Sequence, residues 1–199
     1  MPRDNKIWDE RSRPALIPKW GMAKCELLDQ GENDIERDCA TYAVRQCLIA
    51  MGIDVDNWPI HLELEKFEGN PTSIGDNLEA CVRLRYIKGR ISTSYWPSYL
   101  KAVSRQPVVL GLHQYEGMTR SIDNWISMSN SKVRNPDCSP AKHAVCATGH
   151  VGKRGWWRGG GHYSFLMDTR ASVGRCMISD ADLKLLFDRG EAICFVPVV

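Results

Sequence analysis

The chain has 199 residues, enough for one well-buried domain or for two small lobes that share a cleft. Its hydrophobic content of 43% and charged content of 25% are typical of a soluble globular protein. A formal net charge of +2 is too small to imply a nucleic-acid or membrane partner, and we expect neither.

Residues 1–24 are predicted to form an extended arm. Pro14 and Pro18 oppose a helix there, and the segment has no regular hydrophobic period. The arm mixes both charge signs without an apolar core, so it does not resemble a secretory signal, and no apolar run of the chain approaches a membrane span. We therefore expect a cytoplasmic or virion-associated protein whose eight cysteines are reduced.

Three helices are predicted in the first half of the chain. The first begins with Asp38 as its N-cap, carries apolar residues along one face and ends at Gly52. The second covers residues 73–84, and the third covers residues 97–104 with a proline at its first position.

The second half of the chain is predicted to be mainly β. Four short apolar runs rich in β-forming residues are separated by glycine, proline or polar segments: residues 108–113, 143–151, 162–168 and 192–199. Helices followed by strands indicate an α+β protein, with a helical N-terminal lobe to about residue 105 and an antiparallel β-sheet or barrel lobe over about residues 106–199. A cleft between two lobes is a common place for a functional site.

The cysteines fall into two environments. Some lie within apolar runs, where a free cysteine packs as a small hydrophobic residue: Cys47, Cys81, Cys146 and Cys194. Cys39 differs, because it stands in the first turn of the first predicted helix. The unpaired backbone N–H groups and the positive end of the helix dipole favour a thiolate at that position.

A nucleophilic thiolate requires a histidine partner, and the histidine requires an acceptor that fixes its tautomer. His143 begins the predicted strand over residues 143–151, and Asp168 ends the next predicted strand. A cysteine on a helix with a histidine and an acid on neighbouring strands is a known catalytic geometry. Cys39, His143 and Asp168 are therefore the candidate catalytic residues.

The chain resembles papain-like cysteine peptidases of a divergent microbial or viral kind. Several of its segments are similar to segments of that family and occur in the same order along the chain. DQG at residues 29–31 resembles the segment before the nucleophile, and DCATYAVRQC at residues 38–47 resembles the nucleophile helix. RQPVVLGLH at residues 105–113 resembles the strand that enters the β lobe, KHAVCATGH at residues 142–150 resembles the histidine segment, and FLMDTRASVG at residues 165–174 stands where the family has an asparagine. The resemblance covers roughly residues 14–199 and implies a single catalytic domain over residues 25–199.

The resemblance assigns an oxyanion hole to the Gln30 side chain and the backbone N–H of Cys39. Gln30 is nine residues before Cys39, about three more than is usual in the family, and Asn33 is the alternative donor at the shorter spacing. Two further departures are Ala40, in place of a bulky aromatic residue, and the absence of a tryptophan after Asp168.

The resemblance implies a cysteine-type endopeptidase that cleaves peptide bonds of a peptide or protein substrate without a cofactor. Two other functions stay open. One is a catalytically inactive structural or binding protein, for example a component assembled into a virus particle. The other is a peptidoglycan endopeptidase of the NlpC type, in which the histidine follows the cysteine by about half the 104 residues that separate Cys39 from His143.

A zinc site is a competing interpretation of four residues that lie close together in the sequence: Cys138, His143, Cys146 and His150. In a regular strand, however, His143 points to one face while Cys146 and His150 point to the other. The sequence therefore predicts no metal site.

The segment at residues 153–162 combines basic residues, glycines and the pair Trp156 and Trp157. Such a composition could bind nucleic acid or a phosphate. Because the overall charge is weak, we expect instead a hairpin whose two tryptophans pack over the cleft and contact substrate.

Overall fold

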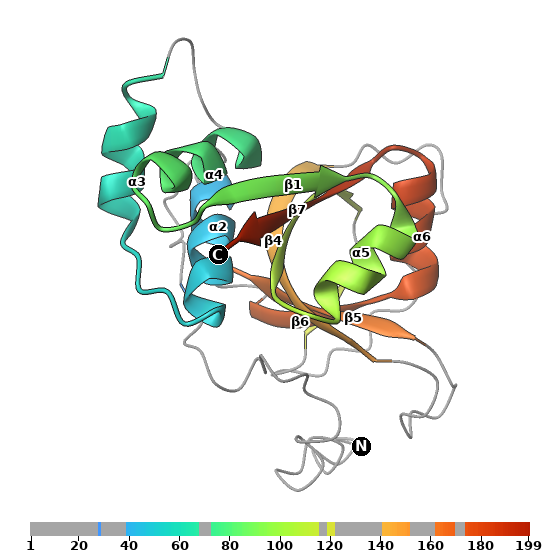
Figure 1. The fold of residues 1–199 in the computed structure, drawn as a ribbon. Coiled ribbons are helices and arrows are strands. Elements are labelled where there is room, and N and C mark those ends of the chain that lie inside the picture. The colour runs from blue at the N-terminus through green and yellow to red at the C-terminus, as the bar shows by residue number, and fades with distance from the viewer. Residues whose placement is uncertain are drawn as a thin grey trace, which may run out of the picture.

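The described part of the chain forms one seven-stranded antiparallel sheet with helices on both sides (Figure 1). The structure is a computed structural model, and it describes residue 28 and residues 39–67, 73–115, 119–121, 141–151, 162–169 and 174–199. The strand order is β1-β7-β2-β4-β5-β6-β3. The predicted α+β class is confirmed, whereas the predicted barrel is not, because among the described strands the sheet stays open between β1 and β3.

The described residues contain five helices: α2 (Cys39–Ala50), α3 (Asn57–Leu64), α4 (Ile74–Arg83), α5 (Trp96–Val103) and α6 (Asp180–Asp188). Three of them, α2, α4 and α5, correspond to the predicted helices, while α3 and α6 were not predicted. Within the described residues, none of these helices has the length and apolar character needed to span a membrane.

The strands are β1 (Gly89–Thr93), β2 (Val108–Gln114), β3 (Thr119–Ser121), β4 (Ala141–Val151), β5 (Tyr163–Asp168), β6 (Gly174–Ser179) and β7 (Ala192–Val198). The four predicted strands correspond to β2, β4, β5 and β7. Strand β1 was not predicted, and it pairs with β7 although it precedes the boundary expected near residue 105. A strand from the mainly helical half of the chain therefore joins the sheet.

Two hydrophobic cores lie on the two faces of the sheet. Alternate residues of a strand point to opposite faces, and on β5 Met167 belongs to one core while Leu166 belongs to the other. The first core contains the apolar face of α2 with residues of α3 and α4, and the second contains residues of α5 and α6. Figure 1 shows these two groups of helices on opposite sides of the sheet.

The pairing of β4 with β5 shifts at Thr148, directly after Ala147. Such a bulge inserts one extra residue and reverses the alternation of side chains beyond it. His150 pairs with Ser164 and lies on the face of Ala147, not on the face of Cys146. The expectation that His150 and Cys146 share a face is therefore wrong, because it assumed an uninterrupted strand.

Gly52 follows the end of α2 and has a φ angle of 84°, in the left-handed region. Its N–H donates to the carbonyl of Ile49, and a Cβ at this position would meet no atom within 4 Å. We expect Gly52→Ala to lower the free energy of unfolding by about 1–2 kcal/mol through backbone strain alone, as measured by urea denaturation.

Gly89→Ala is the matched control, because a Cβ there also meets no atom within 4 Å and the φ angle of Gly89 is not positive. We expect this control to leave stability unchanged or slightly increased. Equal losses in the two variants would contradict the role of the left-handed backbone at Gly52.

Candidate active site

Cys39 is the first residue of α2 and is partly buried. The start of this helix is attached to α4 by a buried hydrogen bond of 2.7 Å in which Thr41 Oγ1 donates to Asn77 Oδ1. Asn77 Nδ2 in turn donates to the backbone carbonyl of Ser73, the N-cap of α4, over 2.9 Å. The Cys39 thiol therefore stands at a helix N-terminus whose position is fixed by apolar packing and by buried polar contacts.

His143 and Asp168 lie on the adjacent strands β4 and β5 and form a buried contact. His143 is 8% exposed and Asp168 is 0% exposed. His143 Nε2 lies 3.0 Å from Asp168 Oδ1, and since an ionised carboxylate can only accept, Nε2–H is the donor. This bond fixes the orientation and tautomer of the imidazole and leaves Nδ1 for a second partner.

That second partner is the Cys39 thiol. Burial raises the pKa of Cys39, but a hydrogen bond from His143 and the His143 charge act in the opposite direction. The backbone N–H groups of Ala144 and Ala40 add to these favourable interactions, and the net result is a pKa of Cys39 below its ordinary value. The arrangement stabilises a thiolate beside an imidazolium.

Other cysteines show the opposite behaviour. The four predicted core cysteines are all fully buried, which confirms their assignment to the core: Cys47, Cys81, Cys146 and Cys194. Burial raises the pKa of Cys81 and of Cys194 to about 12. Burial together with the neighbouring Cys47 thiol raises the pKa of Cys146 well above its ordinary value. Burial therefore opposes the thiolate form of Cys81, Cys146 and Cys194, in contrast to the net effect at Cys39.

The structure thus brings Cys39, His143 and Asp168 together, as the sequence analysis expected. The predicted oxyanion-hole residue Gln30 and its alternative Asn33 lie outside the described residues. The proposed substrate contacts Trp156 and Trp157 also lie outside them, as does the predicted N-cap at residue 38.

The four residues of the competing zinc interpretation do not converge. His143 contacts Cys39 and Asp168, and Cys146 contacts Cys47. His150 contacts a different residue, Asp180. The fourth residue, at position 138, lies outside the described part of the chain.

Two contacts near the ends of elements were missed by sequence reasoning. The backbone N–H of Leu28 donates to Oε1 of the fully buried Gln46 on α2, over 2.8 Å. His150 Nε2 lies 2.6 Å from Asp180 Oδ2, and His162 lies beside them. Neither contact has a signal in local sequence spacing, because each joins segments that only the tertiary fold brings together.

Comparisons with known proteins identify the fold. No family model and no curated protein matches the chain. One matching solved structure is described as a peptidase of the C39-like class from Bacillus anthracis. The match has a TM-score of 0.55 and 13% sequence identity, and it covers 91% of this chain and 96% of the matched chain. The proform of the Amb a 11 cysteine protease, a ragweed pollen allergen, matches with a TM-score of 0.59 and 14% identity, covering 96% of this chain but only 64% of the proform. The chain therefore shares the fold of cysteine peptidases.

The lowered pKa of Cys39 can be measured from the pH dependence of its alkylation by iodoacetamide, followed by mass spectrometry. We expect the rate to reach half its maximum at a pH below the ordinary thiol pKa. His143→Ala removes the stabilising hydrogen bond and charge while burial, which raises the pKa, remains. The half-maximum should therefore move to higher pH, and each increase of one in pKa should slow alkylation about tenfold at low pH.

His61→Ala on α3 is the control for this measurement, because His61 is not among the groups that shift the pKa of Cys39. It should leave the pH dependence of Cys39 alkylation unchanged. An unchanged profile in His143→Ala would contradict the electrostatic role of His143.

Proposed function

We propose that this chain is a papain-like cysteine peptidase in which Cys39 is the nucleophile, His143 the acid–base catalyst and Asp168 the residue that orients the histidine. The observation that carries the proposal is that one imidazole contacts both other groups. It hydrogen-bonds the Cys39 thiol and lies 3.0 Å from the Asp168 carboxylate. The fold shared with two cysteine peptidases supports the same function.

In the first half of the reaction, the Cys39 thiolate attacks the carbonyl carbon of the scissile peptide bond. The carbonyl oxygen becomes an oxyanion, and when the tetrahedral intermediate collapses the C–N bond breaks and a thioester to Cys39 remains. The His143 imidazolium donates its proton to the departing amine. Asp168 holds the imidazole in place and stabilises its charged form before this transfer.

In the second half, a water molecule attacks the thioester carbonyl while neutral His143 accepts a proton from that water. The C–S bond then breaks, the carboxylic acid product leaves, and the thiolate–imidazolium pair is restored. Each step uses the same nitrogen of His143 toward the reacting atoms, since the other nitrogen is engaged by Asp168.

The oxyanion of both steps is stabilised in this proposal by the backbone N–H of Cys39 and by the side chain of Gln30. The N–H groups of the first helical turn have no partner within the helix, which makes the N–H of Cys39 available. The hydrogen bond between Leu28 and Gln46 on α2 attaches the chain to the nucleophile helix two residues before Gln30. Gln46 lies seven residues after Cys39, so the assignment of Gln30 itself rests on the resemblance to papain-like peptidases.

The proposal also covers the organisation of the whole chain. Residues 25–199 act as one catalytic domain, with the substrate peptide lying between the helical lobe and the sheet lobe, and residues 1–24 form an arm. The pair Trp156 and Trp157 contacts the bound peptide. No metal or cofactor takes part in the peptide cleavage.

Labelling with a peptidyl epoxide, which alkylates activated cysteines, tests the proposed function directly. We expect stoichiometric modification at Cys39, mapped by mass spectrometry, with the buried cysteines of the same protein as internal controls. Modification should be lost in Cys39→Ala and in His143→Ala, and so should cleavage of a mixed peptide library. Slow, equal labelling of several thiols without peptide cleavage would mean that the fold serves binding or assembly instead. Cleavage that survives in Cys39→Ala would contradict Cys39 as the nucleophile.

Gln30→Ala tests the oxyanion hole. We expect kcat for a cleaved library peptide to fall about 100-fold to 1,000-fold with a smaller change in KM, because the lost hydrogen bond strengthens in the transition state. Asn33→Ala is the matched comparison and should have little effect. The reverse pattern would assign the hole to Asn33, and two variants with normal kcat would contradict both assignments.

A further inference from the structure

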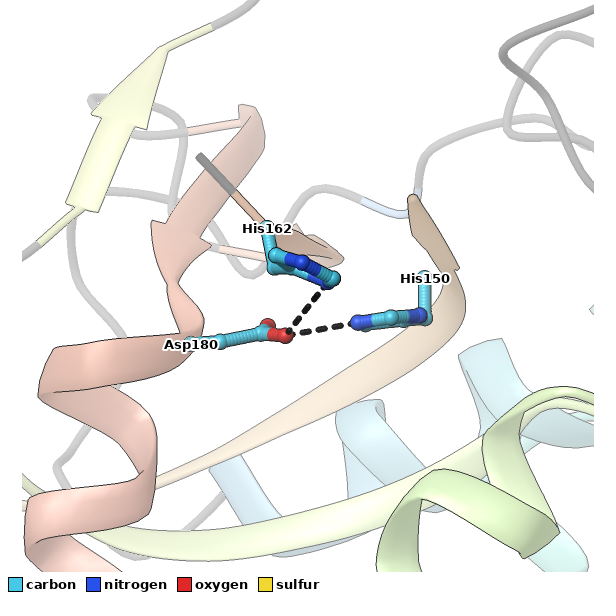
Figure 2. Close-up of side chains that lie close together, drawn as sticks. All are labelled: His150, His162 and Asp180. Atoms are coloured by element: carbon cyan, nitrogen blue, oxygen red, sulfur yellow. Dashed lines mark hydrogen bonds and ion pairs between the residues drawn. The ribbon is translucent and has the colours of Figure 1, made fainter. Parts of the chain in front are cut away.

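A second cluster of titratable side chains lies at the other end of β4 from His143. It contains His150 near the end of β4, His162 directly before β5, and Asp180, the first residue of α6 directly after β6. Figure 2 shows the three side chains pointing toward one another from these three elements. The cluster plays no part in the proposed peptidase chemistry.

The strand register explains why these residues meet. His150 on β4 pairs with Ser164 on β5, and Tyr163 on β5 pairs with Ser179 on β6. One residue further along this antiparallel pair, His162 before β5 lies opposite Asp180 after β6. The N–H of Asp180 donates to the carbonyl of His162 over 3.0 Å. The bulge at Thr148 is needed for the meeting, because it turns His150 to the face of Ser164.

The distances within the cluster suit a metal ion. Asp180 Oδ2 lies 2.6 Å from His150 Nε2 and 4.0 Å from His162 Nδ1. One ligand atom from each of the three residues lies within 4.8 Å of the other two. A tetrahedral zinc ion, about 2.0–2.1 Å from each ligand, separates neighbouring ligand atoms by roughly 3.3 Å. These two distances bracket this value, and the limit of 4.8 Å on the remaining pair exceeds it by at most about 1.5 Å, so small side-chain shifts are sufficient.

The donor set and its surroundings also fit a transition metal. Two imidazoles and one carboxylate are typical ligands of zinc, whereas calcium and magnesium prefer oxygen alone. Ser164 Oγ donates to Asp180 Oδ1 over 3.3 Å, which orients the carboxylate so that Oδ2 faces the histidines. The side chains of His150, His162 and Asp180 are 20%, 42% and 15% exposed, which leaves access for water as a fourth ligand.

We propose that His150, His162 and Asp180 form a zinc-binding site that joins the ends of β4, β5 and β6. His143 and His150 are seven residues apart on β4, roughly 20 Å along an extended strand, so the metal does not reach the Cys39 thiol. His150 and His162 also flank residues 152–161 in the sequence. The metal therefore joins the end of β4 to the start of β5 and stabilises the strand that carries His143. The inference is independent of the proposed peptidase function.

Cobalt provides the direct test, because its spectrum distinguishes nitrogen and oxygen ligands from sulfur. The experiment uses the full chain with Cys39→Ala, so that the thiolate at the candidate active site cannot bind metal, after treatment with a chelator. We expect one equivalent of Co²⁺ to give d–d absorption without a thiolate-to-cobalt charge-transfer band, and Zn²⁺ to displace it. We also expect Zn²⁺ to raise the Tm of the chelator-treated protein.

Variants in the same background assign the ligands. His150→Ala and His162→Ala should each lose both the cobalt spectrum and the rise in Tm, while the control His61→Ala on α3 should retain them. Because His162 is 42% exposed, its substitution is expected to leave the protein folded, as checked by circular dichroism. The proposal is overturned by an absent cobalt spectrum, by a spectrum with sulfur charge transfer, or by a spectrum and a rise in Tm that persist in His162→Ala.

Discussion

The buried contact between α2 and β4 is the constraint on which the candidate active site depends. Cys47 on the helix meets Cys146 on the strand inside a closely packed core. The same helix carries Cys39 and the same strand carries His143, so this packing sets the distance between thiol and imidazole. Core packing resists displacement, because separating these residues would open a cavity. The hydrogen bond between His143 and Asp168 then fixes the rotation of the imidazole, which packing alone does not determine.

Those parts of the fold that depend on local interactions could be predicted from the sequence. The helix α4 was predicted over residues 73–84, and Ser73 and Asp76 indeed form a reciprocal capping box at its start. Gly52 ends α2 as expected, because only glycine adopts its backbone conformation without strain. Cys39, His143 and Asp168 were selected from their positions at element ends and from the order of segments in papain-like peptidases. Whether they meet could not be deduced from spacing, since 104 residues separate Cys39 on α2 from His143 on β4.

The features that were missed are non-local. Strand β1 is short and mostly exposed, and it forms a strand because it pairs with β7. The bulge at Thr148 leaves no periodic signal within β4, yet it changes which face His150 occupies. The bulge therefore lets His150 meet Asp180, a contact that spacing along β4 does not indicate. Its partner Asp180 comes from the junction of β6 and α6, two elements for which no pattern had been identified.

Strand β7 lies inside the sheet, between β1 on one side and β2 on the other, although it follows both in the sequence. During synthesis, β1 and β2 leave the ribosome long before residues 192–198 are available to pair with them. Contacts between residues so far apart in the sequence form slowly. Until β7 pairs with it, the unpaired edge of β2 is exposed to non-native strand pairing. The sheet that supports His143 and Asp168 is therefore completed only after translation has passed β7. A nascent chain that lacks residues 192–198 therefore leaves one edge of β1 and one edge of β2 without their strand partner.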